Sequence, residues 1–179
     1  KAFVKNGGDL EGIQLWLNLP AKSKMIPPNY QHLEKEQIPV ITSIDKKVTL
    51  NIVAGEQKEV LGNIKTQTKV NVFTAKALEN GMMVIDIPEN HQSLIYLLDG
   101  EILVNNSDIL QKGENQMVTF NQDGNSIQFK ATKESTLLIV SGEPIKEKIT
   151  QYGPYVMNTQ TEILEAMRDF QQGKMGHLY

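Results

Sequence analysis

The stretch that decides the fold is residues 94–104, which read Leu-Ile-Tyr-Leu-Leu-Asp-Gly-Glu-Ile-Leu-Val. Two short runs rich in apolar residues flank Asp99-Gly100, and this pair readily adopts the positive φ angles that a tight hairpin requires. We therefore predict a β-hairpin with strands at residues 94–98 and 101–104.

Similar turn signals recur on both sides of this hairpin, at Asn80-Gly81, Lys112-Gly113-Glu114 and Asp123-Gly124. The runs between and before them have β-forming composition and predict strands at residues 38–44, 48–54, 69–77, 82–87, 116–120, 126–130 and 136–140. Many short strands at this spacing are typical of an all-β sandwich or barrel, not of βαβ units.

The two ends of the chain differ from this β-rich block. Residues 13–19 alternate with period two, so Ile13, Leu15, Leu17 and Leu19 fall on one face of a predicted strand. Three prolines and many polar residues then predict an extended connector. Because this connector is long, we expect the first strand to belong to a different sheet. The predicted segments are residues 1–20, a connector at 21–47, the barrel at 48–145 and a tail at 146–179.

The tail contains a predicted amphipathic helix at about residues 159–172. Thr159 and Glu162 have the spacing of a capping box, and Gly173 is a plausible stop. The apolar positions of this helix recur at helical spacing, at Ile163, Ala166, Met167 and Phe170. We expect this face to pack against something outside the helix.

Composition excludes several classes of function. The net charge of −3 and pI near 5.7 argue against direct nucleic-acid binding, because such modules usually carry a basic surface. No apolar run approaches the length of a membrane helix, and no secretory signal is recognisable, so a cytoplasmic protein is expected. The absence of cysteine excludes disulfides, thiolate metal sites and a cysteine nucleophile. The chain begins with Lys1, not methionine.

The histidines give only a weak indication of chemistry. His32, His91 and His177 are far apart, and none stands in an HxH or HExxH pattern. His91 alone has carboxylates nearby in the sequence, at Asp86 and Glu89, which could add oxygen ligands to a metal. The simpler interpretation of each histidine is a surface or loop residue.

Several longer motifs resemble the pirin family. They are residues 12–22 (Gly-Ile-Gln-Leu-Trp-Leu-Asn-Leu-Pro-Ala-Lys), 28–31 (Pro-Asn-Tyr-Gln), 53–55 (Val-Ala-Gly), 141–145 (Ser-Gly-Glu-Pro-Ile) and 151–159 (Gln-Tyr-Gly-Pro-Tyr-Val-Met-Asn-Thr). The resemblance implies a bicupin, meaning two tandem cupin-type β-barrels (jelly rolls). It also implies one iron held by three histidines and one glutamate in the N-terminal barrel. Members are quercetin 2,3-dioxygenases or transcriptional co-regulators.

The resemblance also implies what this chain lacks. All four metal ligands of the family precede the segment matched at residues 12–22, so none can be carried over to this sequence. We therefore expect the C-terminal portion of a pirin: the last strand of a preceding barrel, the connector, the second cupin barrel and the closing helix. In that barrel the shaping glycines Gly81, Gly100 and Gly113 remain. The positions where a metal-binding cupin has its ligands fall near residues 86–89, Ser93 and Gln116. A structural role without its own cofactor is expected.

Two apolar surfaces would then need cover, and we predict interface residues Leu15, Trp16, Leu17, Ile163, Met167 and Phe170. The expected occupant is the N-terminal half of the protein or a second copy of this chain, as a homo-oligomer or swapped dimer.

Three functions remain open. The first is a supporting domain of an iron-dependent dioxygenase, inactive by itself. The second is a regulatory protein-binding module, and the third is a stand-alone cupin enzyme that uses His91 with Asp86 or Glu89.

Overall fold

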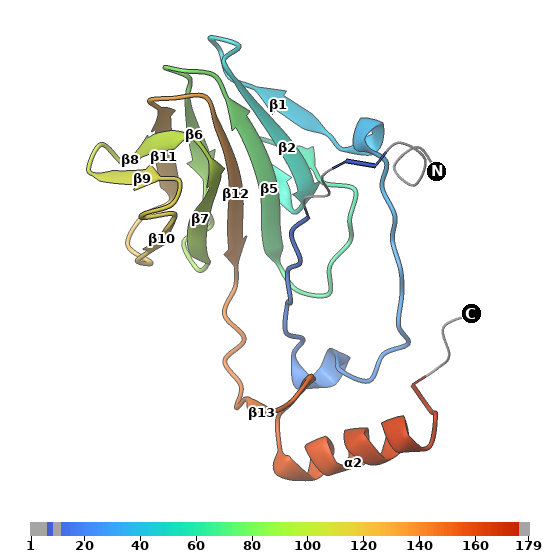
Figure 1. The fold of residues 1–179 in the computed structure, drawn as a ribbon. Coiled ribbons are helices and arrows are strands. Elements are labelled where there is room, and N and C mark those ends of the chain that lie inside the picture. Colours follow the sequence, from blue (N-terminus) through green and yellow to red (C-terminus); the bar gives the residue numbers. More distant parts are fainter. Residues whose placement is uncertain (1–6, 9–11, 176–179) are drawn as a thin grey trace. The chain divides into compact units, whose positions relative to one another are not determined.

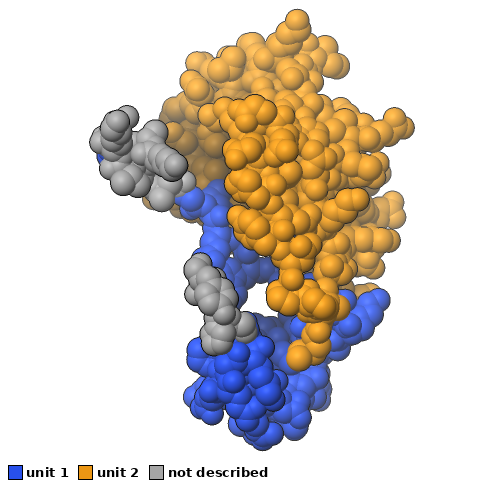
Figure 2. Space-filling view, turned by 90° about the vertical axis from the view of Figure 1, so that its right-hand side faces the viewer, with its two compact units in different colours: residues 1–24, 148–179 blue, residues 25–147 orange. Residues whose placement is uncertain are grey.

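The computed structural model describes residues 7–8 and 12–175. The chain divides into two compact units, which Figure 2 distinguishes by colour. One unit combines residues 1–24 with residues 148–179, and the other is formed by residues 25–147. Each unit is described by itself below.

The unit of residues 25–147 contains two antiparallel sheets (Figure 1). The first has six strands, in the order β1 (Val40–Thr42), β2 (Val48–Ala54), β5 (Val70–Ala77), β12 (Ser135–Gly142), β7 (Gln92–Asp99) and β10 (Met117–Phe120). The second has four, in the order β6 (Met82–Asp86), β11 (Ser126–Ala131), β8 (Glu101–Val104) and β9 (Asp108–Gln111). A small separate hairpin consists of β3 (Glu56–Gln57) and β4 (Val60–Leu61), and the 3-10 turn η2 (Lys35–Gln37) precedes β1.

The two sheets share one hydrophobic core. Residues alternate between buried and exposed along most strands, as expected when one face of a sheet meets water and the other meets a second sheet. The first sheet contributes Leu50 and Phe73, the second contributes Ile85 and Phe129, and all four side chains are fully buried in one cluster. This arrangement confirms the predicted all-β, jelly-roll fold class. Between the described strands of the two sheets there is no ladder, so the domain is a two-sheet sandwich, not a closed barrel.

The hairpin predicted at Asp99-Gly100 is wrong, although both of its strands exist. β7 pairs with β12 and β10 in one sheet, whereas β8 pairs with β11 and β9 in the other. Gly100, at φ +91°, is where the chain crosses between the sheets. A Cβ atom there would lie 2.7 Å from Ser135 Cα and would collide with the Glu134 carbonyl oxygen. Glycine is therefore required here because the chain passes close to the backbone of residues 134 and 135 as it crosses from one sheet to the other. This crossing needs a positive φ, as a tight hairpin does.

The other predicted turns also connect strands of different sheets. Asn80-Gly81 links β5 to β6, Gly113 links β9 to β10, and Asp123-Gly124 links β10 to β11. In each case the two strands belong to different sheets. Within the second sheet, the hairpin is β8–β9, where Asn105 and Asn106 both have positive φ. β9 was not predicted, because this edge strand has only two apolar residues, Ile109 and Leu110, of which only Leu110 is buried.

The other unit contains a short hairpin and the C-terminal helix. β13 (Thr150–Tyr152) pairs with β14 (Tyr155–Met157), and both strands contact α2 (Gln160–Gln171). The predicted capping box is confirmed: the Glu162 backbone N–H donates to Thr159 Oγ1 at 3.3 Å, and the Thr159 backbone N–H donates to Glu162 Oε2 at 2.8 Å. The 3-10 turn η1 (Ala21–Ser23) also lies here.

Residues 13–19 are not a strand in this structure, contrary to the sequence-based prediction. A strand needs a neighbour with which to form a ladder, and no described strand pairs with this segment. Among the described residues, no helix has both the length and the apolar character needed to span a membrane.

Candidate functional site

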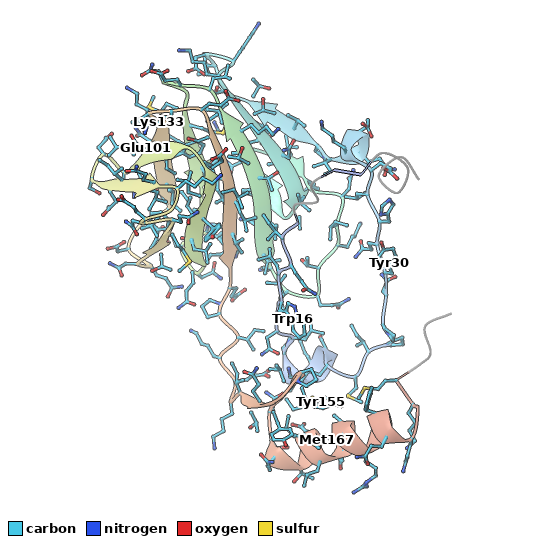
Figure 3. All side chains as sticks on the ribbon, in the orientation of Figure 1. Trp16, Tyr30, Glu101, Lys133, Tyr155 and Met167 are labelled. Atoms are coloured by element: carbon cyan, nitrogen blue, oxygen red, sulfur yellow. The ribbon has the colours of Figure 1, made fainter. Side chains whose placement is uncertain are left out.

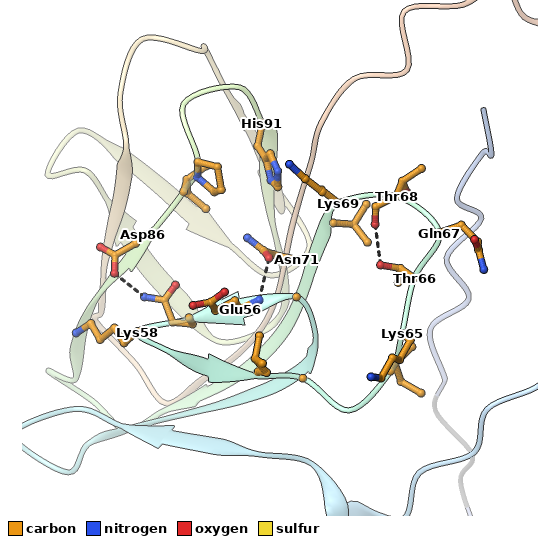
Figure 4. Close-up of a pocket in the computed structure, with 18 residues that line it drawn as sticks. Glu56, Lys58, Lys65, Thr66, Gln67, Thr68, Lys69, Asn71, Asp86 and His91 are labelled. Atoms are coloured by element: carbon orange, nitrogen blue, oxygen red, sulfur yellow. Dashed lines mark hydrogen bonds between the residues drawn. The ribbon is translucent and has the colours of Figure 1, made fainter. Parts of the chain in front are cut away.

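A pocket of the jelly-roll unit lies beside the β3–β4 hairpin (Figure 4). Its volume is about 860 Å³. Three segments line it: residues 55–62 with the small hairpin, residues 64–71 leading into β5, and residues 86–91 between β6 and β7. The pocket is therefore built from connections at one end of the sandwich, where loops supply polar groups and the sheets hold them in place.

A hydrogen-bonded chain of buried polar groups runs from the pocket wall into the sheet. The Glu56 backbone N–H donates to Asn71 Oδ1 at 3.1 Å, which leaves Asn71 Nδ2 to donate to Ser141 Oγ at 3.2 Å. Ser141 Oγ in turn lies 3.0 Å from His91 Nδ1. Asn71 on β5 and Ser141 on β12 are paired directly across the sheet, so the ladder fixes their spacing.

The Ser141 hydroxyl can form its hydrogen bond with His91 in either direction. It has one hydrogen and two lone pairs, so it can accept from Asn71 Nδ2 and either donate to His91 Nδ1 or accept from it. Both tautomers of the neutral imidazole therefore satisfy this contact. Burial lowers the pKa of His91; Glu143 opposes this shift and Lys69 adds to it. Burial thus favours the neutral form of His91.

Gln57 is the second buried polar group of the pocket, and only 2% of its surface is exposed. Its Nε2 donates to Asp86 Oδ2 at 3.1 Å, which fixes the orientation of the side-chain amide. Its Oε1 is buried and has no hydrogen-bond donor among the described residues. A buried acceptor without a partner is uncommon in native proteins and calls for an explanation.

Gly55 allows these groups to come together. It has φ +85°, and a Cβ atom there would collide with Asn71 Oδ1 and lie 2.6 Å from the Val70 carbonyl oxygen. A side chain at this position would push Asn71 away from the Glu56 amide. The glycine is therefore part of the support for the polar chain.

The three weak metal candidates are not brought together as a ligand set. Asp86 is held by Gln57 and His91 by Ser141, and both line the main pocket, whereas Glu89 lines a different surface depression. Across residues 7–8 and 12–175, no group of three or more histidine, aspartate and glutamate side chains could hold a metal ion. These residues therefore do not fit the iron that the family implies. His32 is exposed beside Glu34, and His177 lies outside the described residues.

The predicted interface residues fall into two groups. Trp16 (Figure 3) is 72% exposed and Phe170 is 63% exposed, whereas Leu15 and Leu17 are each a little less than half exposed. Ile163, by contrast, is fully buried, so it is corrected from an interface residue to a core residue of its own unit. The reason is the packing of α2 on β13 and β14, which sequence reasoning did not predict as strands. Met167 is half-buried.

Sequence reasoning missed the polar residues of the pocket: Gln57, Asn71 and Ser141. Asn71 and Ser141 carry one usable signal: each is a polar residue at one of the alternate positions that its strand otherwise uses for buried apolar residues, Phe73 and Ala75 on β5 and Leu137 and Ile139 on β12. Gln57 carries none, since the short strand that holds it is recognisable only in three dimensions.

Comparison with known proteins assigns this architecture to a family. Residues 72–176 match the model of the pirin C-terminal cupin domain. The chain belongs to the pirin family. Its sequence is 33% identical over 172 residues to a putative quercetin 2,3-dioxygenase of Pseudomonas aeruginosa and 34% identical over 167 residues to pirin of Homo sapiens.

A solved structure of quercetin 2,3-dioxygenase from Acinetobacter baumannii superimposes with a TM-score of 0.84 at 34% identity, over 92% of this chain and 56% of that chain. The alignments with the two pirin relatives cover 96% and 92% of this chain but only 59% and 57% of the relatives. This sequence thus corresponds to somewhat more than half of a pirin. The family relationship is confirmed, and the relatives' names connect the family with quercetin 2,3-dioxygenase-like proteins.

Proposed function

We propose that this chain is the supporting C-terminal cupin of a pirin-type protein. In this proposal, the metal-dependent, quercetin 2,3-dioxygenase-like chemistry takes place in the part of the relatives that this sequence does not cover. The proposal is carried by the observation that two of the candidate metal ligands form hydrogen bonds with other side chains: Asp86 with Gln57, and Nδ1 of His91 with Ser141. The family resemblance, in which iron lies in the N-terminal cupin, points the same way.

The test compares two proteins prepared in parallel. One is this chain, and the other is this chain extended at its N-terminus to the length of its relatives. Iron content is measured after loading with Fe²⁺, and quercetin consumption is followed by absorbance. We expect stoichiometric iron and turnover in the longer protein and neither in this chain. Stoichiometric iron or quercetin turnover in this chain by itself would overturn the proposal and favour an enzyme that uses His91.

We further propose that the segment around Trp16 is a contact surface for the N-terminal cupin. Trp16 and Leu17 are exposed, while the next residues are anchored: Lys24 Nζ donates to Asn18 Oδ1 at 2.5 Å and to the Val156 carbonyl oxygen at 3.0 Å. A fixed segment that presents large apolar side chains is typical of a protein interface.

This surface is tested with Trp16→Ala, which should weaken association between this chain and a separately expressed N-terminal cupin about tenfold or more. Tyr30→Ala is the matched control, because Tyr30 is also an exposed aromatic residue but is outside the proposed surface. Light scattering of this chain by itself separates the alternatives. If this chain forms a dimer that Trp16→Ala dissociates, the surface binds a second copy of the chain. If Trp16→Ala and Tyr30→Ala weaken association with the N-terminal cupin equally, the proposed contact surface is refuted. The regulatory role, the cytoplasmic location and the lack of direct nucleic-acid binding stay predictions.

A further inference from the structure

The β3–β4 hairpin forms one wall of the pocket and belongs to neither of the two main sheets. Only two residue pairs join its strands. A glycine stands at each end of it, and the Gly62 backbone N–H donates to the Gly55 carbonyl oxygen at 2.8 Å. The hairpin is thus a small separate element, joined to the rest of the domain through two residues that have no side chain to restrict backbone rotation.

The turn at the tip of this hairpin is strained. Lys58 and Glu59 have φ angles of +47° and +66°, and neither is a glycine. The favoured two-residue hairpin turn needs positive φ at both central positions, which is why Asn-Gly is the preferred pair there. Lysine and glutamate seldom adopt this region, so both residues raise the free energy of the closed hairpin relative to a conformation in which the turn can relax.

A buried polar atom also disfavours the closed hairpin. The Gln57 side chain belongs to β3 and is almost completely buried, and its Oε1 has no hydrogen-bond donor among the described residues. Water would donate to this oxygen in an exposed position, so burial without a donor carries the desolvation penalty of the amide carbonyl. A movement of the hairpin that exposes Gln57 would remove this penalty.

Hydrogen bonds and one apolar contact hold the hairpin in its closed position. The Glu56 backbone N–H donates to Asn71 Oδ1 and Gln57 Nε2 donates to Asp86 Oδ2, each at 3.1 Å, and Figure 4 shows both bonds as dashed lines. Val60 adds packing against the hydrophobic core. The strained turn and the unsatisfied amide oxygen oppose these contacts, so a local opening should require much less free energy than unfolding of the two sheets.

We propose that the β3–β4 hairpin is a lid over this pocket and opens as one unit about Gly55 and Gly62. In the closed position Gln57 is buried, and Leu61, which is 64% exposed, lines the pocket. Opening brings the Gln57 amide into water and widens the entrance to the pocket. The lid is a property of this domain and does not depend on the proposed role of the chain in a dioxygenase.

Amide hydrogen exchange of the unmodified, folded chain tests the lid. The two reporters are the Glu56 and Gly62 N–H groups, which are hydrogen-bonded at the two ends of the hairpin. We expect their protection from exchange to be about a hundredfold or more below that of the central amides of β5 and β12, and to agree between the two reporters within about threefold. Low urea concentrations should leave exchange at the reporters unchanged, because a local opening exposes little surface, but should accelerate it in β5 and β12.

Two variants should shift the opening in opposite directions. Lys58→Asn combined with Glu59→Gly supplies the preferred turn pair and should slow exchange at both reporters about fivefold or more. Asp86→Ala removes the acceptor of Gln57 Nε2 and should accelerate exchange at both reporters several-fold. Neither variant should change exchange in the centre of β5 and β12.

Each variant has a matched control that should not affect the reporters. Lys46→Gly relieves a positive φ of +59° in a turn outside the hairpin. Glu89→Ala removes an exposed carboxylate that does not line this pocket. If either variant shifts exchange at the reporters no more than its control does, the lid is overturned.

The unmodified chain can also overturn the proposal by itself. Reporters as protected as β5 and β12, reporters that urea accelerates in parallel with the sheets, or reporters that differ from each other more than about tenfold would each exclude a lid that opens as one unit. These three comparisons still decide the matter if a variant does not fold. Because no measurement involves iron or turnover, failure here is distinguishable from failure of the proposed dioxygenase relationship.

Discussion

Ser141 Oγ lies 3.0 Å from His91 Nδ1, although the two residues are 50 positions apart in the sequence. Ser141 is fixed on β12, in the middle of the six-stranded sheet, and His91 stands just before β7. The hydroxyl ties the pocket loop to the sheet. The effect of this bond on stability is open to measurement.

Ser141→Ala should destabilise the jelly-roll unit by about 1–3 kcal/mol in the free energy of unfolding. The substitution leaves Asn71 Nδ2 and His91 Nδ1 buried without their shared partner. The free energy of unfolding is measured by urea denaturation, with the loss of secondary structure monitored by far-UV circular dichroism. Ser126→Ala, at an exposed serine of β11, is the control and should change the free energy by no more than about 0.5 kcal/mol. Equal values for the two variants would contradict a structural role for the Ser141 hydroxyl.

Stability should fall as the pH decreases below about 6.5, and His91 should account for part of this loss. Burial lowers the pKa of His91 from its ordinary value of 6.5, and Glu143 only partly opposes the shift. The unfolded chain therefore binds a proton at a higher pH than the folded chain does. The stabilising contribution is complete above pH 6.5 and is lost as the pH falls through the folded-state pKa.

The measurement is the free energy of unfolding at pH 7.5 and pH 5.5 for the unmodified chain and for His91→Gln. We expect the variant to lose less stability between these two values. Four carboxylates also have lowered pKa values: Asp45 beside Ser43, Asp99 beside Lys112, Glu101 beside Lys133 and Glu162 beside Thr159. Because their ordinary pKa values are already 3.8 or 4.5, they titrate below this interval. Identical slopes for the two proteins would show that His91 does not cause the effect.

Gly100→Ala should be one of the most damaging single substitutions in the chain, with a loss of about 4 kcal/mol or more. It combines a φ of +91° with a collision against the backbone of residues 134 and 135. Gly113→Ala is the matched control, because Gly113 has φ +86° but no atom near its Cβ position, so only about 1–3 kcal/mol of backbone strain applies. Thermal and urea unfolding of both variants give the comparison. A similar loss in both would mean that the crossing at Gly100 tolerates a side chain.

Thr159→Ala should weaken the start of α2 by about 1 kcal/mol, because the Glu162 amide loses its side-chain acceptor. Amide hydrogen exchange of residues 160–171 reports this locally, without requiring the two units to unfold together. Thr161→Ala, one residue inside the helix and exposed, should leave exchange unchanged or slow it. Faster exchange in both variants to the same degree would argue against the capping box.

The ion pair between Lys133, which is exposed, and Glu101, which is partly buried, should contribute little to stability. Lys133 Nζ lies 2.8 Å from Glu101 Oε2, beside the crossing at Gly100 (Figure 3). The lysine is well exposed, so Lys133→Met should change the free energy of unfolding by no more than about 1 kcal/mol, and less in 1 M NaCl. A loss as large as that of Gly100→Ala would show that the ion pair, not the glycine, holds this crossing.

The sequence by itself determined the elements whose causes are local. The predicted bounds of β2 and β8 agree with the structure, and the start of α2 was readable from Thr159 and Glu162 because a cap involves only neighbouring residues. The positive φ at Gly100 was also predictable. What the turn connects was not: a hairpin and a crossing between sheets use the same backbone angle, and burial of Leu97 and Ile102 in the shared core decides between them.

Only the tertiary structure decided the candidate site. Asn71, His91 and Ser141 come from three separate parts of the chain, and no local spacing relates them. Their partnership follows from the pairing of β5 with β12, which depends on which apolar faces are buried together. Likewise, Ile163 is a core residue and not an interface residue, because it is buried in the unit where α2 packs on β13 and β14. Local sequence fixes backbone angles and capping bonds, whereas burial, which selects strand partners and buried polar contacts, is a property of the whole domain.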